Sequence, residues 1–147
     1  MIQIKTFKEL SLDELYAILQ LRSEVFVVEQ NCVYQDIDKN HHDSYHVMIK
    51  QEEELVAYLR IIKHYPLFSD PPSIGRVVIP LSHRKKGYAR SIMLYAINYI
   101  YTDLKENTIV ISAQKYLIQF YESLGFITIG EGYLEDGIPH IIMAHTK

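Results

Sequence analysis

A short basic loop is the segment of this sequence with the most distinct chemistry. The loop runs from Ser82 to Gly87 (SHRKKG), shortly after residues 75–80 (GRVVIP) and before a segment with helical periodicity. The branched residues Val77, Val78 and Ile79 before the loop favour a buried strand. The first amides of a helix have no acceptor inside the helix, and the helix dipole favours negative charge there. The sequence therefore predicts an anion site at the start of a helix.

Two charged residues are expected on the apolar side of an early helix. Ser11 and Glu14 have the spacing of a capping box, which predicts the helix start. Arg22 lies on the apolar stripe of this helix, and Glu29 follows two turns later on the same side. The stripe consists of Leu12, Leu15, Ile18, Leu19, Val25 and Phe26. Because a buried charge is costly unless it is paired, two interpretations stay open: a structural ion pair, or the charged lining of a pocket.

A polar loop over residues 31–44 contains residue types that bind metals. The segment DIDKN at 36–40 imitates the opening of a calcium loop, but His41 stands where glycine is required. Val47 stands where calcium loops have a bidentate glutamate. Three histidines near these aspartates could suggest zinc, but adjacent histidines in a polar loop are more often solvated. We therefore predict no metal site.

Periodicity along the chain predicts an α/β (α+β) protein with the element order β-α-β-β-β-α-β-α-β-β. Strands are expected over residues 2–7, 45–50, 55–64, 75–80, 109–113, 127–130 and 139–145. A second helix carries an apolar stripe from Ala89 to Ile100, and a third covers residues 114–126, with Gly125 at its C-cap. Residues 65–73 and 132–137 are expected as a loop and a turn.

Composition restricts the class of protein. The 147 residues include 22% charged residues and carry a net charge of −3, which is typical of one globular domain over residues 1–147 and not of a nucleic-acid binder. Cys32 is the only cysteine, so the chain cannot form an internal disulfide framework. The first residues lack the apolar core of a signal peptide, and no run approaches the ~20 apolar residues of a membrane span. We expect a cytoplasmic protein without membrane contact.

Two motifs together resemble the GNAT superfamily of acetyl-CoA-dependent N-acetyltransferases. Residues 84–89 (RKKGYA) match the superfamily's coenzyme A pyrophosphate loop, and residues 120–126 (FYESLGF) look like its C-terminal motif. Residues 22–30 (RSEVFVVEQ), 75–76 and 137–140 (GIPH) further resemble the ElaA-type subfamily. The resemblance covers essentially the whole chain. It implies a GNAT-type fold, with a mixed, mostly antiparallel central sheet flanked by helices in a single domain.

The resemblance assigns roles to particular residues. Backbone amides of the loop would hold the pyrophosphate of acetyl-CoA, with Gly87 allowing close approach, and the backbone of the preceding strand would bind pantetheine and thioester. Tyr121 would be the general acid that protonates the departing thiolate. Gln114 stands where many members have asparagine, which leaves its contact with coenzyme A open. The implied coenzyme-binding residues are Val77, Val78, Ile79, Arg84, Lys85, Lys86, Gly87, Tyr88, Ala89 and Gln114.

The residue that takes a proton from the acceptor amine is less defined. A carboxylate or a histidine can do this, often through water, and the candidates are Glu29, His46 and His140. Acidic residues gather in segments expected near the acceptor: Glu29, Asp36, Asp38, Asp43, Glu131, Glu135 and Asp136. They would either attract a cationic amine or form a solvated acidic surface.

The resemblance implies an enzyme that transfers acetyl from acetyl-CoA directly to a primary amine, either a small molecule or a peptide, without a metal. Two alternatives remain open. The chain could be a non-catalytic acyl-CoA-binding regulatory module, or an enzyme related to the acyl-homoserine-lactone synthases, which also carry an Arg-x-x-Val-Phe segment like residues 22–26. The sequence leaves a homodimer open.

Overall fold

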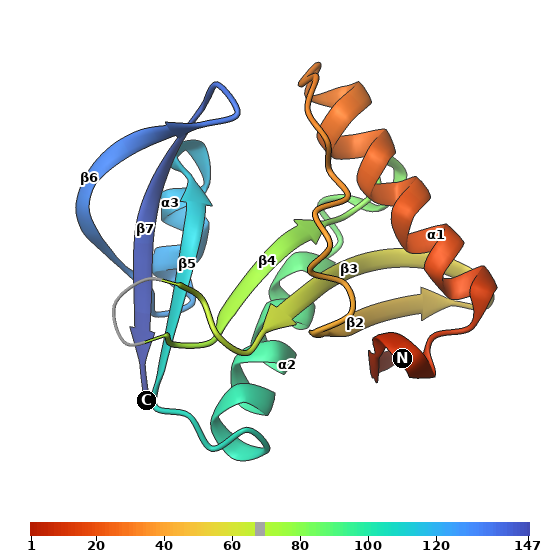
Figure 1. The fold of residues 1–147 in the computed structure, drawn as a ribbon, viewed down its shortest axis with the longest axis horizontal. Helices are drawn as coiled ribbons and strands as arrows, with labels where there is room; N and C mark the ends of the chain where they lie inside the picture. The colour runs from red at the N-terminus through yellow and green to blue at the C-terminus, as the bar shows by residue number, and fades with distance from the viewer. Residues whose placement is uncertain (67–69) are drawn as a thin grey trace.

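The protein consists of two antiparallel sheets with helices around them (Figure 1). The computed structural model describes residues 1–66 and 70–147. The strands are β1 (Ile2–Thr6), β2 (Ser44–Gln51), β3 (Glu54–Ile62), β4 (Ser73–Val78), β5 (Thr108–Gln114), β6 (Ile127–Glu135) and β7 (Ile138–Thr146). The helices are α1 (Leu12–Arg22), α2 (Tyr88–Thr102) and α3 (Ile118–Ser123), with short helical segments η1 (Phe7–Glu9), η2 (Ser23–Glu29), η3 (Leu81–His83) and η4 (Lys115–Leu117). The predicted fold class and the order of strands and α-helices are confirmed.

The two sheets meet at β4 and β5. The first sheet has the strand order β1-β2-β3-β4 and the second β5-β7-β6. The amide of Val110 donates to the carbonyl of Pro72 at 3.1 Å, which joins the two strands near their starts. From there the strands run in a similar direction and diverge (Figure 1). This divergence leaves room for a ligand between the sheets.

One apolar core spans both sheets. The stripe of α2 packs into it as predicted, with Ile92, Met93, Ala96, Ile97 and Ile100 buried against residues of β2, β3, β5 and β7. A smaller cluster lies on the other face of the first sheet, where α1 contacts Met48 and Tyr58. Because side chains alternate along a strand, consecutive residues of β2 point to opposite faces of the sheet, towards α2 on one face and α1 on the other.

The start of α1 confirms the predicted capping box. The amide of Glu14 donates to the Ser11 hydroxyl at 3.0 Å, and the Ser11 amide donates to the Glu14 carboxylate at 2.8 Å. The prediction that Leu12 belongs to the buried stripe is wrong, because this side chain is 85% exposed at the first turn.

The end of this helix excludes one of the two interpretations that the sequence left open, an ion pair between Arg22 and Glu29. Arg22 is buried as expected, but α1 continues as the π-helical turn η2, in which each turn takes more residues than in an α-helix. Glu29 is therefore rotated away from the face of Arg22 and is exposed. Neither residue is the other's partner.

The C-terminal part differs from the prediction in two boundaries. The expected helix over 114–126 is shorter, because β5 continues to Gln114 and η4 precedes α3; Gly125 ends this helix with φ 101, as predicted. The expected turn over 132–137 narrows to Asp136 and Gly137, with φ 52 and 78. Two consecutive residues with positive φ form the tight hairpin turn typical of an Asp-Gly pair, so β6 extends to Glu135.

The expected loop over residues 65–73 is described only in part, since 67–69 lie outside the described residues. Its last residue, Ser73, already belongs to β4, which ends at Val78, two residues before the predicted end of that strand. None of the helices in the described part of the chain has the length and hydropathy of a membrane span.

Candidate active site

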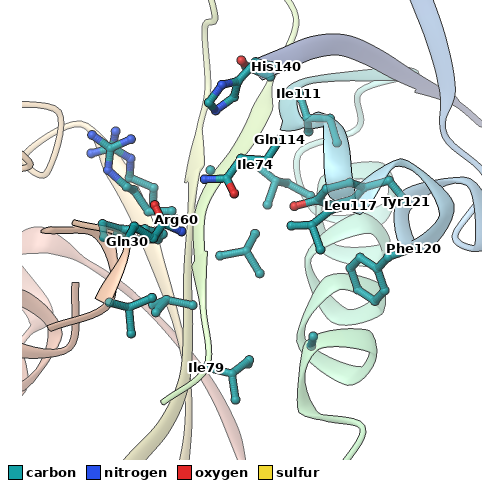
Figure 2. A pocket seen from close by; sticks show the side chains of 18 of the residues that line it. Gln30, Arg60, Ile74, Ile79, Ile111, Gln114, Leu117, Phe120, Tyr121 and His140 are labelled. Carbon is teal, nitrogen blue, oxygen red and sulfur yellow. The ribbon is translucent and has the colours of Figure 1, made fainter. Parts of the chain in front are cut away.

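A cavity of about 800 Å³ lies where β4 and β5 diverge. Its walls come from β4 and β5, the start of α2, the segment η4–α3 and the hairpin turn between β6 and β7. Figure 2 shows Gln114, Leu117 and Tyr121 on one side of the cavity, with Arg60 and Gln30 on the other. The cavity brings together residues from nearly every part of the chain.

The predicted anion loop forms one end of this cavity. Gly87 is the N-cap of α2 and has φ 85, a left-handed conformation that glycine adopts without a Cβ clash. No side chain of the described residues caps this helix start, so its first amides are available to a ligand. All residues predicted to bind the coenzyme line the cavity except Lys86, which is exposed and outside the lining. The geometry suits an anion such as a pyrophosphate.

Arg84 and Glu29 bind each other at the edge of the loop. The Arg84 Nη1 and Nη2 donate to the Glu29 carboxylate at 2.6 and 2.8 Å, and its Nε donates to the Ile79 carbonyl at 2.9 Å. Hydrogen bonding to Arg84 lowers the pKa of Glu29, against a smaller opposing effect of burial. A carboxylate held in this way is a poor proton acceptor, so we no longer favour Glu29 as the base.

Tyr121 and Gln114 reach the middle of the cavity (Figure 2). The Tyr121 hydroxyl has no hydrogen-bond partner among the described residues, while burial and then the nearby Tyr116 phenol raise its pKa to about 12. Gln114 is the last residue of β5 and lies opposite His140 of β7 in the strand register. A neutral phenol, an amide and an imidazole thus point into one space.

His140 is held in a defined orientation. Its Nδ1 donates to the Ile138 carbonyl at 2.7 Å, which leaves Nε2 as the acceptor nitrogen of the neutral ring. The Glu135 carboxylate lies 3.6 Å from Nε2. His46, in contrast, is fully buried, bonded to the Tyr58 hydroxyl and the His41 carbonyl, and outside the cavity lining. The geometry therefore favours His140 over His46 as a proton acceptor.

An ion-pair network lies behind the cavity wall opposite His140. Arg22 is 0% exposed and bonds through Nε to Asp36 at 2.9 Å. Arg76 Nε lies 2.8 Å from the same carboxylate. Arg60 donates hydrogen bonds to both carboxylate oxygens of Asp38. Burial alone would raise the pKa of Asp38, but these hydrogen bonds hold it well below its usual range. The charges of Asp36 and Asp38 are thus compensated by arginines, so these two residues fit neither of the interpretations that the sequence left open, attraction of a cationic amine or a solvated acidic surface.

Arg60 was not predicted as a site residue. It lies in the apolar run of β3, with buried neighbours on both sides, and lines the cavity together with Arg76. A single charged residue inside such a run was the available signal, because a buried charge requires a partner or a function.

The family follows from the chain as a whole. A family model described as an acetyltransferase (GNAT) domain matches residues 7–147. The chain belongs to the GNAT acetyltransferase family. Protein ElaA of Escherichia coli is 44% identical over 138 residues, which cover 92% of this chain and 90% of ElaA.

Solved structures of GNAT proteins share the fold. The crystal structure of Escherichia coli ElaA matches with a TM-score of 0.90 and 41% identity, covering 99% of this chain and 98% of that one. An acyl-CoA N-acyltransferase from Pseudomonas aeruginosa also reaches 0.90, with 38% identity and 99% of each chain covered. An aminoglycoside 6'-N-acetyltransferase complexed with coenzyme A reaches 0.74 at 17% identity, covering 98% of this chain and 96% of that one, which reflects the fold alone.

Proposed function

We propose that this GNAT protein transfers the acetyl group of acetyl-CoA to the nitrogen of a primary amine. The observation that carries the proposal is one continuous cavity that extends from the start of α2 to the Tyr121 hydroxyl and His140 Nε2. Within residues 1–66 and 70–147, no side chain caps this helix start and no group bonds to the Tyr121 hydroxyl. An anion site and a proton donor and acceptor therefore share one space. Membership of the GNAT acetyltransferase family supports the same reaction class.

Acetyl-CoA would supply the activated acetyl group, and the residues of one wall fit it. The amides at the start of α2 would bind the pyrophosphate, with Gly87 leaving the backbone accessible. Val77, Val78 and Ile79 line the cavity at the end of β4, and their backbone would bind the pantetheine arm. Lys85 also lines the cavity and would contact phosphate oxygens, whereas Arg84 must first exchange its bonds with Glu29.

Protons balance across the transfer. The amine arrives as an ammonium ion, loses one proton to solvent, and forms the new C–N bond as the C–S bond breaks. His140 Nε2 accepts the second amine proton, and Tyr121 donates its hydroxyl proton to the leaving sulfur. The proton on His140 then restores the Tyr121 hydroxyl through solvent. The thiolate leaves in a buried site that disfavours its charge. Its proton affinity therefore rises toward that of the Tyr121 phenolate.

Release of coenzyme A thiol from acetyl-CoA, measured with the purified protein and a panel of amines, tests the proposal. Amine-dependent release above the protein-free rate is the expected result. Tight acetyl-CoA binding without release for any amine would contradict the transferase and favour a non-catalytic acyl-CoA-binding module. Absence of both binding and release would contradict the assignment of the loop as well.

A further inference from the structure

We propose that the acceptor is a small amine that also carries a carboxylate, and that Arg76 binds this carboxylate. The inference rests on the proposed transfer and names its second substrate by chemical class. It starts from the charge of the two walls at the acceptor end of the cavity, which have opposite sign.

The first wall carries an excess of positive charge. Three guanidinium groups, Arg22, Arg60 and Arg76, share only two carboxylates, Asp36 and Asp38. His41 and His46 lie beside these groups and are neutral. Burial and then the nearby Arg22 lower the pKa of His41 to about 4, and burial also lowers the pKa of His46. Among the described residues, one positive charge of this cluster therefore has no matching carboxylate. A ligand carboxylate would compensate this charge.

Arg76 is the member that a ligand can reach. Its side chain is 22% exposed and lines the cavity, with the guanidinium 5.9 Å from the centre of the Phe26 ring. Its Nε and Nη2 face Asp36 and Asp38, whereas its Nη1 has no partner within the described part of the chain. Guanidinium N–H groups form their strongest hydrogen bonds with carboxylates.

The backbone at Arg76 is unusual in a way that fits a binding role. Along β4, the pairs Tyr58–Val78 and Arg60–Gly75 place three steps opposite two steps of β3, so β4 has an extra residue here. Arg76 lies in this bulge with φ 52, a left-handed conformation that costs a non-glycine residue about 1 kcal/mol. Such outliers occur preferentially where a side chain is positioned for function.

The opposite wall is acidic. Glu135 and Asp136 of the β6–β7 hairpin line the cavity next to His140. An ammonium group would be attracted here, beside the proposed proton acceptor, while a carboxylate would be drawn to Arg76. An amino-carboxylate acceptor therefore binds in one orientation, with its nitrogen towards His140. A second cationic group in place of the carboxylate would meet the positive wall and be repelled.

Matched acceptors test the charge of the second group. We would compare glycine, β-alanine and γ-aminobutyrate with methylamine, ethylamine and propylamine, which lack only the carboxylate, and with putrescine. The expected result is that the best amino acid exceeds its matched amine at least about tenfold in kcat/KM, which is the discrimination of one charge-assisted hydrogen bond. Faster transfer to the plain amines or to putrescine would overturn the inference while leaving the transferase intact.

Arg76→Gln is the matched variant. It should reduce the preference for the carboxylate severalfold or more by raising KM for the amino acid, with less change for the plain amine. Lys63→Gln is the control, because it removes the same charge just beyond β3 at an exposed position outside this cavity. An unchanged preference in Arg76→Gln would overturn the assignment of Arg76.

Binding separates this inference from the proposed function. Calorimetric titration of the same amino acids and amines into the protein, with coenzyme A present, needs no turnover. If no amine releases thiol but an amino acid binds more tightly than its matched amine, the carboxylate site at Arg76 stands, whereas the transferase and with it the acceptor role fail. If no amino acid binds better than its matched amine, the inference is overturned whatever the activity.

Discussion

At the scale of single residues, the partner of a hydroxyl distinguishes a candidate acid from a structural tyrosine. Burial raises the pKa of Tyr58, Tyr101 and Tyr121 to about 12 in each case. The hydroxyl of Tyr58 bonds to His46 and that of Tyr101 to His145, whereas Tyr121 alone of the three lines the cavity. A raised pKa therefore reflects burial in all three, and the free hydroxyl in the cavity is what supports a catalytic role for Tyr121.

Tyr121→Phe should lower kcat about 10²- to 10⁴-fold while leaving the Kd for acetyl-CoA nearly unchanged, because only a proton donor is lost. Since the pKa of Tyr121 is about 12, its ionisation should not reduce the turnover of the unaltered protein below about pH 11. Steady-state kinetics across pH and coenzyme titration provide both measurements. A variant with unchanged kcat would remove Tyr121 from the mechanism.

His140→Asn tests the proton acceptor. The asparagine amide can replace the hydrogen bond that Nδ1 donates to Ile138, so the hairpin should keep its geometry while the acceptor nitrogen is lost. We expect kcat to fall about 10²-fold or more, with partial rescue by added imidazole. Measurement of thiol release with and without imidazole decides this, and full activity without rescue would contradict the role.

At the scale of elements, charged side chains join segments that are distant in the sequence. Glu14 of α1 accepts hydrogen bonds from Lys5 of β1 at 3.0 Å and from Lys50 of β2 at 2.7 Å. Arg84 joins the basic loop to Glu29 at the end of η2. The two bonds of Glu14 hold α1 on the sheet. The bonds between Arg84 and Glu29 connect the proposed coenzyme site with the segment that leads to the proposed acceptor wall.

Glu14→Gln should lower the free energy of unfolding by about 2 kcal/mol at neutral pH. Burial alone would raise the pKa of Glu14, but the bonds from Lys50, the Ser11 amide and Lys5 lower it from 4.5 to about 2. Because the folded pKa is depressed, the stabilisation is complete above about pH 4.5 and is lost as pH falls towards 2. Urea unfolding at several pH values should show the difference between variant and parent shrinking over this range.

Glu106→Gln is the control for this series, because Glu106 is exposed in the loop before β5 and makes no hydrogen bond through its side chain among the described residues. It should leave the unfolding free energy unchanged. A constant difference between Glu14→Gln and the parent protein at all pH values would contradict the proposed ionic contribution.

Glu29→Gln should release Arg84 and remove a negative charge next to the phosphate site, so we expect a severalfold lower Kd for acetyl-CoA. Turnover at saturating substrates should change less than about threefold, since this residue is not the proposed base. Calorimetry and steady-state kinetics check both quantities. The exposed β6 variant Glu131→Gln removes the same charge and should change neither value; a hundredfold loss of kcat in Glu29→Gln would restore Glu29 as the base.

At the scale of the whole molecule, the cavity is a consequence of sheet geometry. The bond between Val110 and Pro72 holds β4 and β5 together at one end, and the shared apolar core around α2 holds the two sheets in place. As the strands diverge (Figure 1), they no longer pair with each other, and residues of both strands line the cavity instead. The two proposed substrates would thus meet in the space between the N-terminal start of α2 and the charged walls.

Local patterns in the sequence predicted the strands and helices in their correct order. The capping box at Ser11, the stripe of α2 and the left-handed Gly125 each depend on residues within a few positions, so the local sequence suffices. The start of a helix directly after the basic loop was likewise predicted, whereas anion binding at this helix start stays a prediction. Two of the predictions that failed, Leu12 in the core and the wide turn before Gly137, concern the ends of elements, where packing and turn geometry decide.

The sequence by itself determined the family and the order of the elements, and it named candidate site residues, although it missed Arg60. Only the tertiary structure decided which charges are free: Asp36 neutralises Arg22, Glu29 binds Arg84, and Arg60 reaches the cavity from an apolar strand. These partners are 14 and 55 residues apart for the first two pairs, and their distance depends on how helices and sheets pack. A charge pattern along the chain therefore says which groups exist, whereas packing determines which of them meet each other and which are left for a substrate.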